Sequence, residues 1–300
     1  MEHHAGLFDV YLDRDQGKVW LALPPADERG VHARCLYVEG LATGLGSNPV
    51  GLDRGQLGPT RVVALRSVGK RIFVEEENHA YRALTREAEE VRAARESFAT
   101  SVLWGGAIDS FDEDGRPLFD FTSFVARDAH GSQRSLESAG GSWSLDADRS
   151  AVDLDACLAF PDNLEFEALL TFKGDKAGRE VRSVAPASDA VTLVQHHSLV
   201  RLPDAGYSPR PLDPRVGAFG IRFLDFSAAP DEPIEKRWAT RHRMRRLDHA
   251  VPGPEGDVPD VFYARPIVYY VDRGMPEPIR TAVIQGASWW QAAFEAAGFQ

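Results

Sequence analysis

The sequence predicts an α+β fold that is mainly antiparallel β, arranged as hairpins and a meander with a few helices. Three observations predict it. Pairs of β-prone runs recur, each joined by a short polar turn. Only two stretches within this β-prone part favour helix. Hydrophobic residues make up 43% and charged residues 26% of the 300 residues, a composition typical of a globular protein with a substantial core.

Three hairpins are predicted in the first part of the chain. In each hairpin, a turn rich in Asp, Gly, Ser or Lys separates two β-prone runs, which is the usual sequence signal of this motif. The predicted strand pairs are 7–12 with 19–23, 61–65 with 71–74, and 101–108 with 117–121. Successive antiparallel pairs of this kind predict a meander.

Two helical stretches interrupt the strands. Residues 85–100 are rich in Ala, Glu and Arg, and residues 122–139 form a second helical stretch that contains Gly131. Residues 206–220 hold three prolines, so we expect an extended crossing there rather than a central strand. Further strands are predicted at 142–145, 165–172 and 191–202, and an exposed polar loop at 173–188.

The C-terminal part of the sequence has a different pattern. Pro and Gly recur at short intervals in residues 251–263, which predicts a linker. Residues 266–271 are a compact apolar run that predicts a buried strand, and apolar residues at helical spacing after Pro278 predict a long amphipathic helix. A single strand and helix cannot close a core alone. The expected organisation is a β-rich accessory domain at 1–250, a linker at 251–263, and a strand with a helix at 264–300.

Composition excludes some classes of partner. The formal net charge of −11 argues against nucleic acid, because neutralising phosphates requires a basic surface, and the basic segment 236–246 is too short to supply one. Cys35 and Cys157 are the two cysteines, and we expect both to be buried thiols. No apolar run reaches the length of a membrane span, and residues 1–6 lack the features of a secretion signal.

The common catalytic and metal-binding patterns do not occur in the sequence. His196 and His197 are adjacent in a predicted strand, so their imidazoles should lie on opposite faces and cannot chelate one ion. The Asp-rich segments 13–17 and 109–115 lack the closing Glu of a calcium loop, so we interpret them as turns. None of the nine histidines belongs to an HExxH motif. The sequence therefore predicts neither catalytic nor metal-ligating residues in this chain.

Several short segments, spread over nearly the whole chain, share the order and character of one known family. They are GLFDVY (6–11), YVEGLATGLGSN (37–48), GLDRGQLG (51–58), SFATSVLW (97–104), QHHS (195–198), DPRVG (213–217), RPIVYYVD (265–272), EPIR (277–280) and GASWW (286–290). Together they resemble a domain of unknown function, and the segment that follows it, in large bacterial zinc-dependent metalloproteases.

The resemblance implies a particular place for this chain in a longer protein. In that family the domain precedes a metzincin-like catalytic domain, which opens with a strand and a long helix, and residues 265–299 resemble that opening. The zinc ligands and the catalytic Glu are then expected beyond Gln300, in a chain truncated before HExxH. The resemblance also implies zinc as cofactor of the full-length protein, a catalytic domain in cis and a peptide substrate as its partners, and export from the cell.

Two other interpretations stay open. One is a stand-alone β-rich binding module for a peptide, a polysaccharide or a partner protein. The other is a complete enzyme with an unfamiliar site, whose candidate residues are His79, Asp128, His130 and Glu165.

One segment is a candidate contact with the catalytic cleft or with a neighbouring domain. It is the proline-bounded segment 207–220, with Arg210, Asp213 and Arg215 as the residues expected to make that contact.

Overall fold

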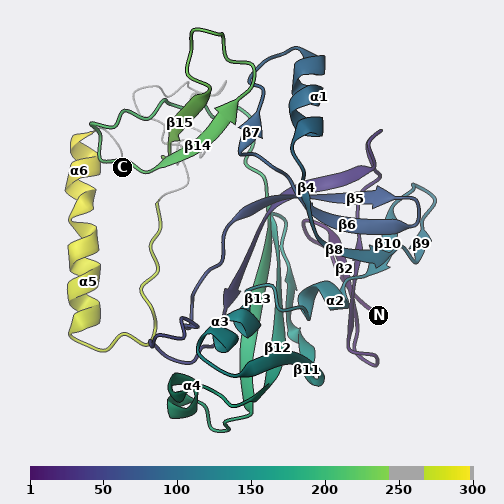
Figure 1. The fold of residues 1–300 in the computed structure, drawn as a ribbon, viewed down its shortest axis with the longest axis vertical. Helices are drawn as coiled ribbons and strands as arrows, with labels where there is room; N and C mark the ends of the chain where they lie inside the picture. Colours follow the sequence, from purple (N-terminus) through teal and green to yellow (C-terminus); the bar gives the residue numbers. More distant parts are fainter. Residues whose placement is uncertain (243–266, 298–300) are drawn as a thin grey trace, which may run out of the picture. The chain divides into compact units, whose positions relative to one another are not determined.

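The computed structural model describes residues 1–242 and 267–297 (Figure 1). The chain divides into two compact units, residues 1–204 with 225–230, and residues 205–224 with 231–300. The predicted linker at 251–263 and the end of the basic segment, residues 243–246, lie outside the described residues. The mainly antiparallel β fold predicted from the sequence is confirmed.

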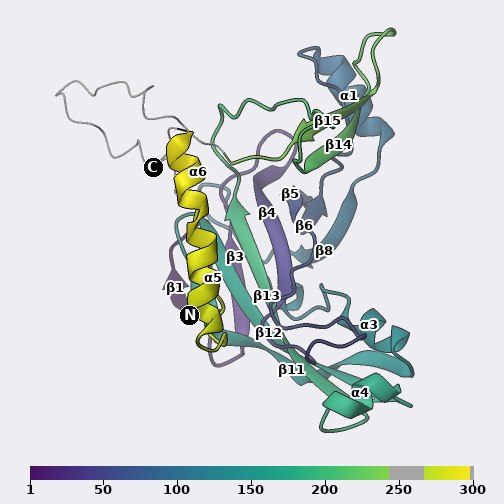
Figure 2. The same ribbon diagram turned by 90° about the vertical axis from the view of Figure 1, so that its left-hand side faces the viewer.

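A seven-stranded antiparallel sheet forms the centre of the first unit, with the strand order β11-β12-β13-β4-β5-β6-β8. Figure 2 shows β12, β13 and β4 side by side. Its strands are β4 (Val31–Leu41), β5 (Arg61–Val68), β6 (Arg71–Glu76), β8 (Ser101–Ala107), β11 (Ser142–Ala159), β12 (Asn163–Asp175) and β13 (Ala190–Arg201). Burial alternates along β12 and β13, so one face of the sheet is packed and the other is more open. We call these the inner face and the outer face.

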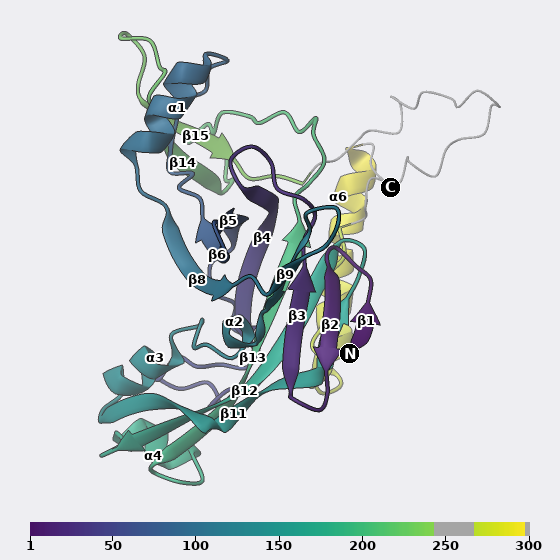
Figure 3. The same ribbon diagram turned by 90° about the vertical axis from the view of Figure 1, so that its right-hand side faces the viewer.

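A five-stranded sheet, with the order β1-β2-β3-β10-β9, completes the first unit. Figure 3 shows β1, β2 and β3 side by side. Its strands are β1 (Glu2–His4), β2 (Asp9–Asp13), β3 (Lys18–Ala22), β9 (Ser110–Phe111) and β10 (Pro117–Asp120). The core unites the inner face of the larger sheet with this sheet, and it includes the fully buried rings of Phe119, Phe121, Phe124 and Phe166. Offset and edge-to-face contacts join these rings, such as Phe121 on Phe124 at 4.3 Å between centroids.

The first two predicted hairpins are confirmed. The third is wrong, because its two predicted strands do not pair with each other. β2 pairs with β3, and β5 pairs with β6, as their turns predict. β8 pairs with β6 in the larger sheet, whereas β10 pairs with β9 and β3 in the smaller one. The turn after β9 closes the hairpin locally, because Asp112 Oδ1 accepts the N–H groups of Asp114 and Arg116. This confirms that the Asp-rich segment acts as a turn.

Two predictions about helices and loops need correction, and one is confirmed. Helix α1 (Ala88–Ser97) lies within the first predicted helix. The second predicted helix, 122–139, is two short helices, α2 (Thr122–Val125) and α3 (Ser132–Ser138), since Gly131 takes a left-handed φ of 77° immediately before α3. The predicted loop 173–188 contains α4 (Arg179–Val184), because Val181 is fully buried in the core.

The second unit holds a hairpin beside an extended segment. Strand β14 (Gly220–Asp225) pairs with β15 (Glu235–Ala239). Pro211 forms an isolated bridge with Trp238, and the flanking backbone groups of Arg210 and Leu212 bond to β15 at 2.9 Å each. The predicted extended crossing at 206–220 is therefore confirmed up to the start of β14.

The C-terminal segment is helical, and its predicted strand is wrong. Helices α5 (Ile279–Ser288) and α6 (Trp290–Ala296) follow one another at Trp289, as the apolar spacing predicts. Residues 267–272 take no strand conformation, and residue 266 lies outside the described part. An apolar run forms a strand only where a neighbouring strand accepts its hydrogen bonds, and none does so within the described ranges.

Among the described residues, no helix combines the length and the apolar character that crossing a bilayer requires.

Candidate functional site

The outer face of the larger sheet carries two groups of polar side chains. His196 on β13 lies opposite Gly40 on β4. Arg34 lies on the same face of β4 as Gly40, because Arg34 and Gly40 are an even number of positions apart along the strand. Arg34 in turn lies opposite Ala64 on β5, which lies opposite Glu75 on β6. The outer face therefore presents a cluster around His196 at one part and a charged cavity around Glu75 at another.

The first group is centred on His196. Its Nε2 lies 2.7 Å from Glu165 Oε2 and its Nδ1 lies 3.1 Å from Glu167 Oε1, both on the neighbouring strand β12. The Ser198 hydroxyl donates to the same Glu165 oxygen, and Asn163 Nδ2 donates to Glu165 Oε1 at 2.6 Å. The hydrogen bond that His196 donates to Glu165, together with its contact to Glu167, raises the pKa of His196 against the effect of burial. Burial raises the pKa of Glu165, but the bonds from His196, Ser198 and Asn163 outweigh it and lower that pKa.

Ser198, His196 and Glu167 have the connectivity of a catalytic triad, with Ser198 Oγ 3.3 Å from His196 Nε2. Glu165 changes what this arrangement can do. One oxygen of its carboxylate contacts both the Ser198 hydroxyl and His196 Nε2, so it competes with the serine-to-histidine hydrogen bond that a triad requires. The geometry therefore favours a fixed ionic cluster over a nucleophile.

His197, the adjacent residue, lies on the inner face and is fully buried. The predicted opposite orientation of the two histidines is confirmed. The His197 Nδ1 accepts from the Tyr37 hydroxyl at 2.9 Å, and its Nε2 donates to the Val125 carbonyl at 2.9 Å. Arg127 Nη2 donates to the same Tyr37 oxygen at 3.0 Å. Burial, with the charge of Arg127, lowers the pKa of His197 to about 3, so this imidazole is neutral and structural.

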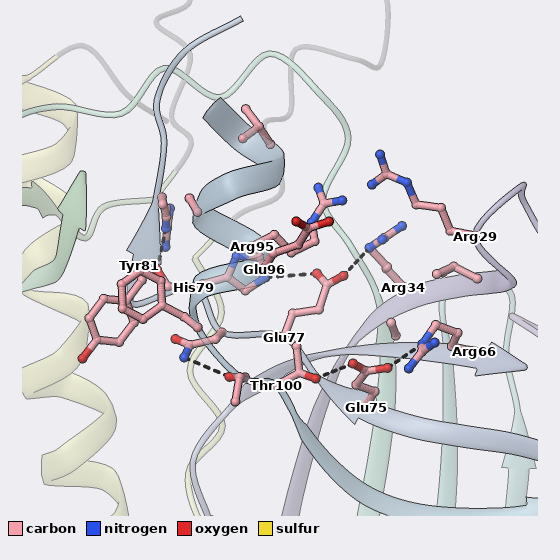
Figure 4. Close-up of a pocket in the computed structure, with 18 of the residues that line it drawn as sticks. Arg29, Arg34, Arg66, Glu75, Glu77, His79, Tyr81, Arg95, Glu96 and Thr100 are labelled. Atoms are coloured by element: carbon pink, nitrogen blue, oxygen red, sulfur yellow. Dashed lines mark hydrogen bonds and ion pairs between the residues drawn. The ribbon is translucent and has the colours of Figure 1, made fainter. Parts of the chain in front are cut away.

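The second group lines an open cavity of about 980 Å³ (Figure 4). Its floor is the outer face of β4, β5 and β6, and its walls are α1 and the segment that joins β6 to α1. Volumes of this order are typical of ligand sites. The charged and aromatic residues that line it are Asp27, Glu28, Arg29, Arg34, Arg66, Glu75, Glu77, His79, Tyr81, Arg82, Arg95, Glu96 and Phe98.

Two carboxylates on the cavity floor are fully engaged. Glu77 contacts Arg34 Nε at 2.7 Å and His79 Nε2 at 3.2 Å, one through each oxygen. The hydrogen bond from His79, together with Arg34, lowers the pKa of Glu77 to about 2 against the effect of burial. Glu75 accepts from Arg66 Nε at 2.6 Å and from the Thr100 hydroxyl with its other oxygen. Glu77 is therefore ionised at neutral pH, and both carboxylates are held in place by their partners.

The wall of the cavity is held by aromatic stacking and by backbone hydrogen bonds. Tyr81 stacks on Phe98 with ring centroids 4.0 Å apart and an interplanar angle of 9°, and Phe226 packs against Phe98 at 4.9 Å. Asp225 Oδ1 accepts the N–H of Leu84 at 2.9 Å. Ala94 on α1 is buried, so the helix has an anchor on the sheet side. These contacts fix the wall relative to the floor within the first unit.

Of the candidate residues from the sequence, His79 lines this cavity, whereas Asp128, His130, Glu165, Arg210, Asp213 and Arg215 do not. Arg215 pairs with Asp213, with Nε 2.9 Å from Oδ1, and the side chain of Arg210 is exposed. The contact of Arg210, Asp213 and Arg215 with a catalytic cleft or a neighbouring domain stays a prediction. His79 contacts Glu77, Asp128 caps the first N–H groups of α3, and Glu165 contacts His196. These contacts lie in separate places, so they do not form the single site that the unfamiliar enzyme would need.

The two cysteines are free and buried, as the sequence predicts. Burial raises the pKa of each thiol to about 12, which keeps both protonated and unreactive.

Apart from His79, sequence reasoning missed the cavity residues. Glu75 lies on β6, and Glu77 directly follows that strand with its N–H bonded to the Val62 carbonyl of β5. Two positions apart in extended backbone, they share a face, which is a local signal for a charged surface. Their meeting with Arg34 and Arg95 depends on strand register and on the position of α1, which no local pattern encodes. In the described ranges, no group of three or more His, Cys, Asp or Glu side chains is placed to hold a metal ion.

These features define an antiparallel β protein of two sheets with a charged cavity on the outer face of the larger one. Comparison with known proteins gives its family. A family model described as a domain of unknown function, DUF5117, matches residues 55–246, and the chain belongs to that family. The match includes the cavity residues on β5, β6 and α1, whereas Arg29 and Arg34 precede it. No curated protein and no solved structure matches the chain.

Proposed function

We propose that this chain is a non-catalytic N-terminal accessory region of a zinc-dependent metallopeptidase, and that its C-terminal helix packs into the catalytic domain that follows in cis. The observation that carries the proposal is the exposed apolar surface of α5 and α6. Neither helix buries a single residue within the described part of the chain. Trp289 and Trp290 are 78% and 69% exposed, which is unusual for the largest apolar side chains.

The apolar residues of these helices form a stripe rather than scattered positions. Ile279, Val283 and Trp290 are spaced by four and seven residues, so they share one side of a helix. Apolar stripes of this kind pack against another element in a finished domain. This supports a missing partner for the helix, and the resemblance of residues 277–290 to the opening of a metallopeptidase catalytic domain is the reason for proposing that domain as the partner.

The proposal assigns zinc to the catalytic domain. The described residues supply no set of three ligands, and the nine histidines include no HExxH pair. The role of this chain is then to support or orient, and no bond-making step belongs to its residues. The Asp213–Arg215 pair on the proline-bounded segment is the proposed contact with the cleft, since both side chains reach the surface.

A second candidate function, an independent binding module, is favoured by the cavity on the outer face. The cavity is complete within residues 27–100 and needs no other domain. The coding sequence after Gln300 discriminates the two functions. An HExxH-bearing continuation is expected for the accessory region, whereas an immediate native stop codon favours the independent module.

The direct experiment compares the 300-residue chain with a chain extended through that continuation. We expect bound zinc and peptidase turnover from the extended protein, and neither from the 300 residues when zinc is added. Zinc-dependent turnover by the 300 residues alone contradicts the proposal. In the extended protein, Arg215→Ala should reduce turnover without changing stability. The control is Arg222→Ala, since Arg222 is another exposed arginine of the second unit that forms one ion pair with a carboxylate. Unchanged turnover in Arg215→Ala removes the cleft contact while leaving the accessory role.

A further inference from the structure

We propose that the cavity on the outer face binds an acidic peptide, with Arg29 and Arg95 as the residues that receive its carboxylates. The proposal depends only on the first unit, and it holds whether or not a catalytic domain follows. It starts from the hydrogen-bonding capacity of the cavity, because a ligand site must offer what its ligand lacks.

On the cavity floor, free donors outnumber free acceptors, whereas the carboxylates of Asp27, Glu28 and Glu96 lie in the turn before β4 and on α1. Each oxygen of Glu75 and of Glu77 already receives a partner. Arg34 and Arg66 contact these carboxylates through Nε, and within the described residues their Nη groups make no hydrogen bond. Each guanidinium therefore keeps N–H donors that are unused. A donor-rich surface of this kind selects an acceptor-rich ligand, which in a peptide means Asp or Glu side chains.

Arg29 and Arg95 add two charges that the protein does not neutralise by contact. In the part of the chain that the structure describes, neither side chain makes an ion pair or a hydrogen bond. Arg95 comes from α1, and Arg29 comes from the turn before β4, so the two enter the cavity from different elements (Figure 4). Arg guanidinium groups bind carboxylates in a bidentate manner, which suits this role.

The backbone around Arg29 is rigid although its side chain is free. Asp27 Oδ1 accepts the N–H groups of Arg29 and Val31, each at 2.9 Å. Gly30 takes a left-handed φ of 77° and lies so close to β5 that a Cβ at this position would be 2.5 Å from the Ser67 carbonyl oxygen. The turn therefore holds the backbone of Arg29 in place in the cavity lining, so that binding a ligand requires ordering of the side chain alone.

The size and the lining of the cavity favour a peptide over a small anion. A volume of about 980 Å³ far exceeds that of one phosphate or one carboxylate group. Between the charged groups the lining includes Ala64, Val91 and Ala94, which offer apolar contact to the stem of a side chain. Two separated cationic groups with apolar surface between them match acidic side chains spaced along a chain. The ligand class is therefore an acidic peptide segment.

The experiment measures binding of a fluorescent peptide of alternating Glu and Ala to the full 300-residue chain by anisotropy. The same peptide with Gln in place of Glu is the matched ligand, and inorganic phosphate and polygalacturonate are the competing probes. Arg29→Ala and Arg95→Ala are the test variants. Arg134→Ala on α3 is the control, because Arg134 is exposed on a helix and lies outside the cavity.

We expect the Glu peptide to bind more tightly than the Gln peptide, and added salt to weaken it. Each test variant should weaken binding by about three- to tenfold, and the double variant by the product of the two effects. Thermal unfolding should be unchanged in both variants, since neither side chain has a partner to lose. Arg134→Ala should bind as the parent does.

Three results would overturn the proposal. The first is equal binding of the Glu and Gln peptides. The second is full binding by the double variant of Arg29 and Arg95. The third is displacement of the peptide by phosphate or polygalacturonate at lower concentrations than by unlabelled Glu peptide, which would identify a small-anion or a polysaccharide site instead.

Discussion

Large aromatic residues are buried in the β region of the first unit and exposed in the C-terminal helices of the second unit. Phe121, Phe124 and Phe166 are fully buried and contact one another in the core. Trp289 and Trp290, by contrast, expose most of their surface. The difference teaches that the first unit closes its own core, whereas the helices leave their apolar side chains exposed within the described residues. This contrast is the observation on which the proposed accessory role rests.

The largest expected effect is in the core of the first unit. Phe121→Ala should lower the free energy of unfolding by about 3–5 kcal/mol, since it removes a fully buried ring and leaves a cavity. Phe111→Ala is the matched control, because Phe111 is half exposed at the edge of the smaller sheet, and it should change stability by less than about 1 kcal/mol. Denaturant unfolding measures both. Equal effects would show that the first unit has no self-sufficient core.

The next prediction concerns the C-terminal helices, and its failure would remove the contrast between the two units. Replacing Trp289 and Trp290 together by Ala should leave the unfolding of the 300-residue chain within about 0.5 kcal/mol of the parent, because exposed side chains contribute little. In a chain extended by the catalytic domain, the same change should cost about 2–4 kcal/mol, as expected for aromatic residues at the centre of an interface. A large effect in the 300-residue chain would mean that the helix already has its partner there.

Much of the fold is predictable because its signals are local. The first two hairpins, α1 and the C-terminal helix follow from turn residues and from apolar spacing. The partner of β8 was predicted wrongly because pairing with β6 across the α1 excursion depends on non-local contacts. The cavity has the same origin, since Arg34, Glu75 and Arg95 come together only through strand register and helix placement. The α4 helix was missed because a single buried Val181 anchors it.

A smaller effect is expected from the cavity floor and depends on pH. The pKa of Glu77 is about 2 in the folded chain, below its ordinary value of 4.5. Its contribution to stability is therefore fully present above pH 4.5 and is lost as the pH falls from 4.5 toward 2. Glu77→Gln should reduce stability at pH 7 by less than about 1 kcal/mol, because the group is partly solvated. The variant should also lose less stability than the parent between pH 4.5 and pH 2, and thermal unfolding at a series of pH values measures this.

The smallest effect sharpens the contrast between the two faces of the larger sheet. The pKa of His196 is raised by Glu165 and Glu167, so its contribution to stability is present below pH 6.5 and is lost as the pH rises through the raised value. His196→Gln should therefore cost more at pH 5.5 than at pH 8.5, by less than about 1 kcal/mol. Chemical denaturation at the two pH values measures it. A greater cost at pH 8.5 would contradict the charged state assigned to His196.

The central claim is that the apolar side of α5 and α6 is covered only when a catalytic domain follows. Hydrogen–deuterium exchange over residues 279–296 tests it most directly, when measured in the 300-residue chain and in a chain extended through the HExxH-bearing continuation. The account predicts rapid exchange in the shorter chain, strong protection in the longer one, and unchanged exchange in β12 and β13. Equal exchange of the two helices in both chains would contradict it.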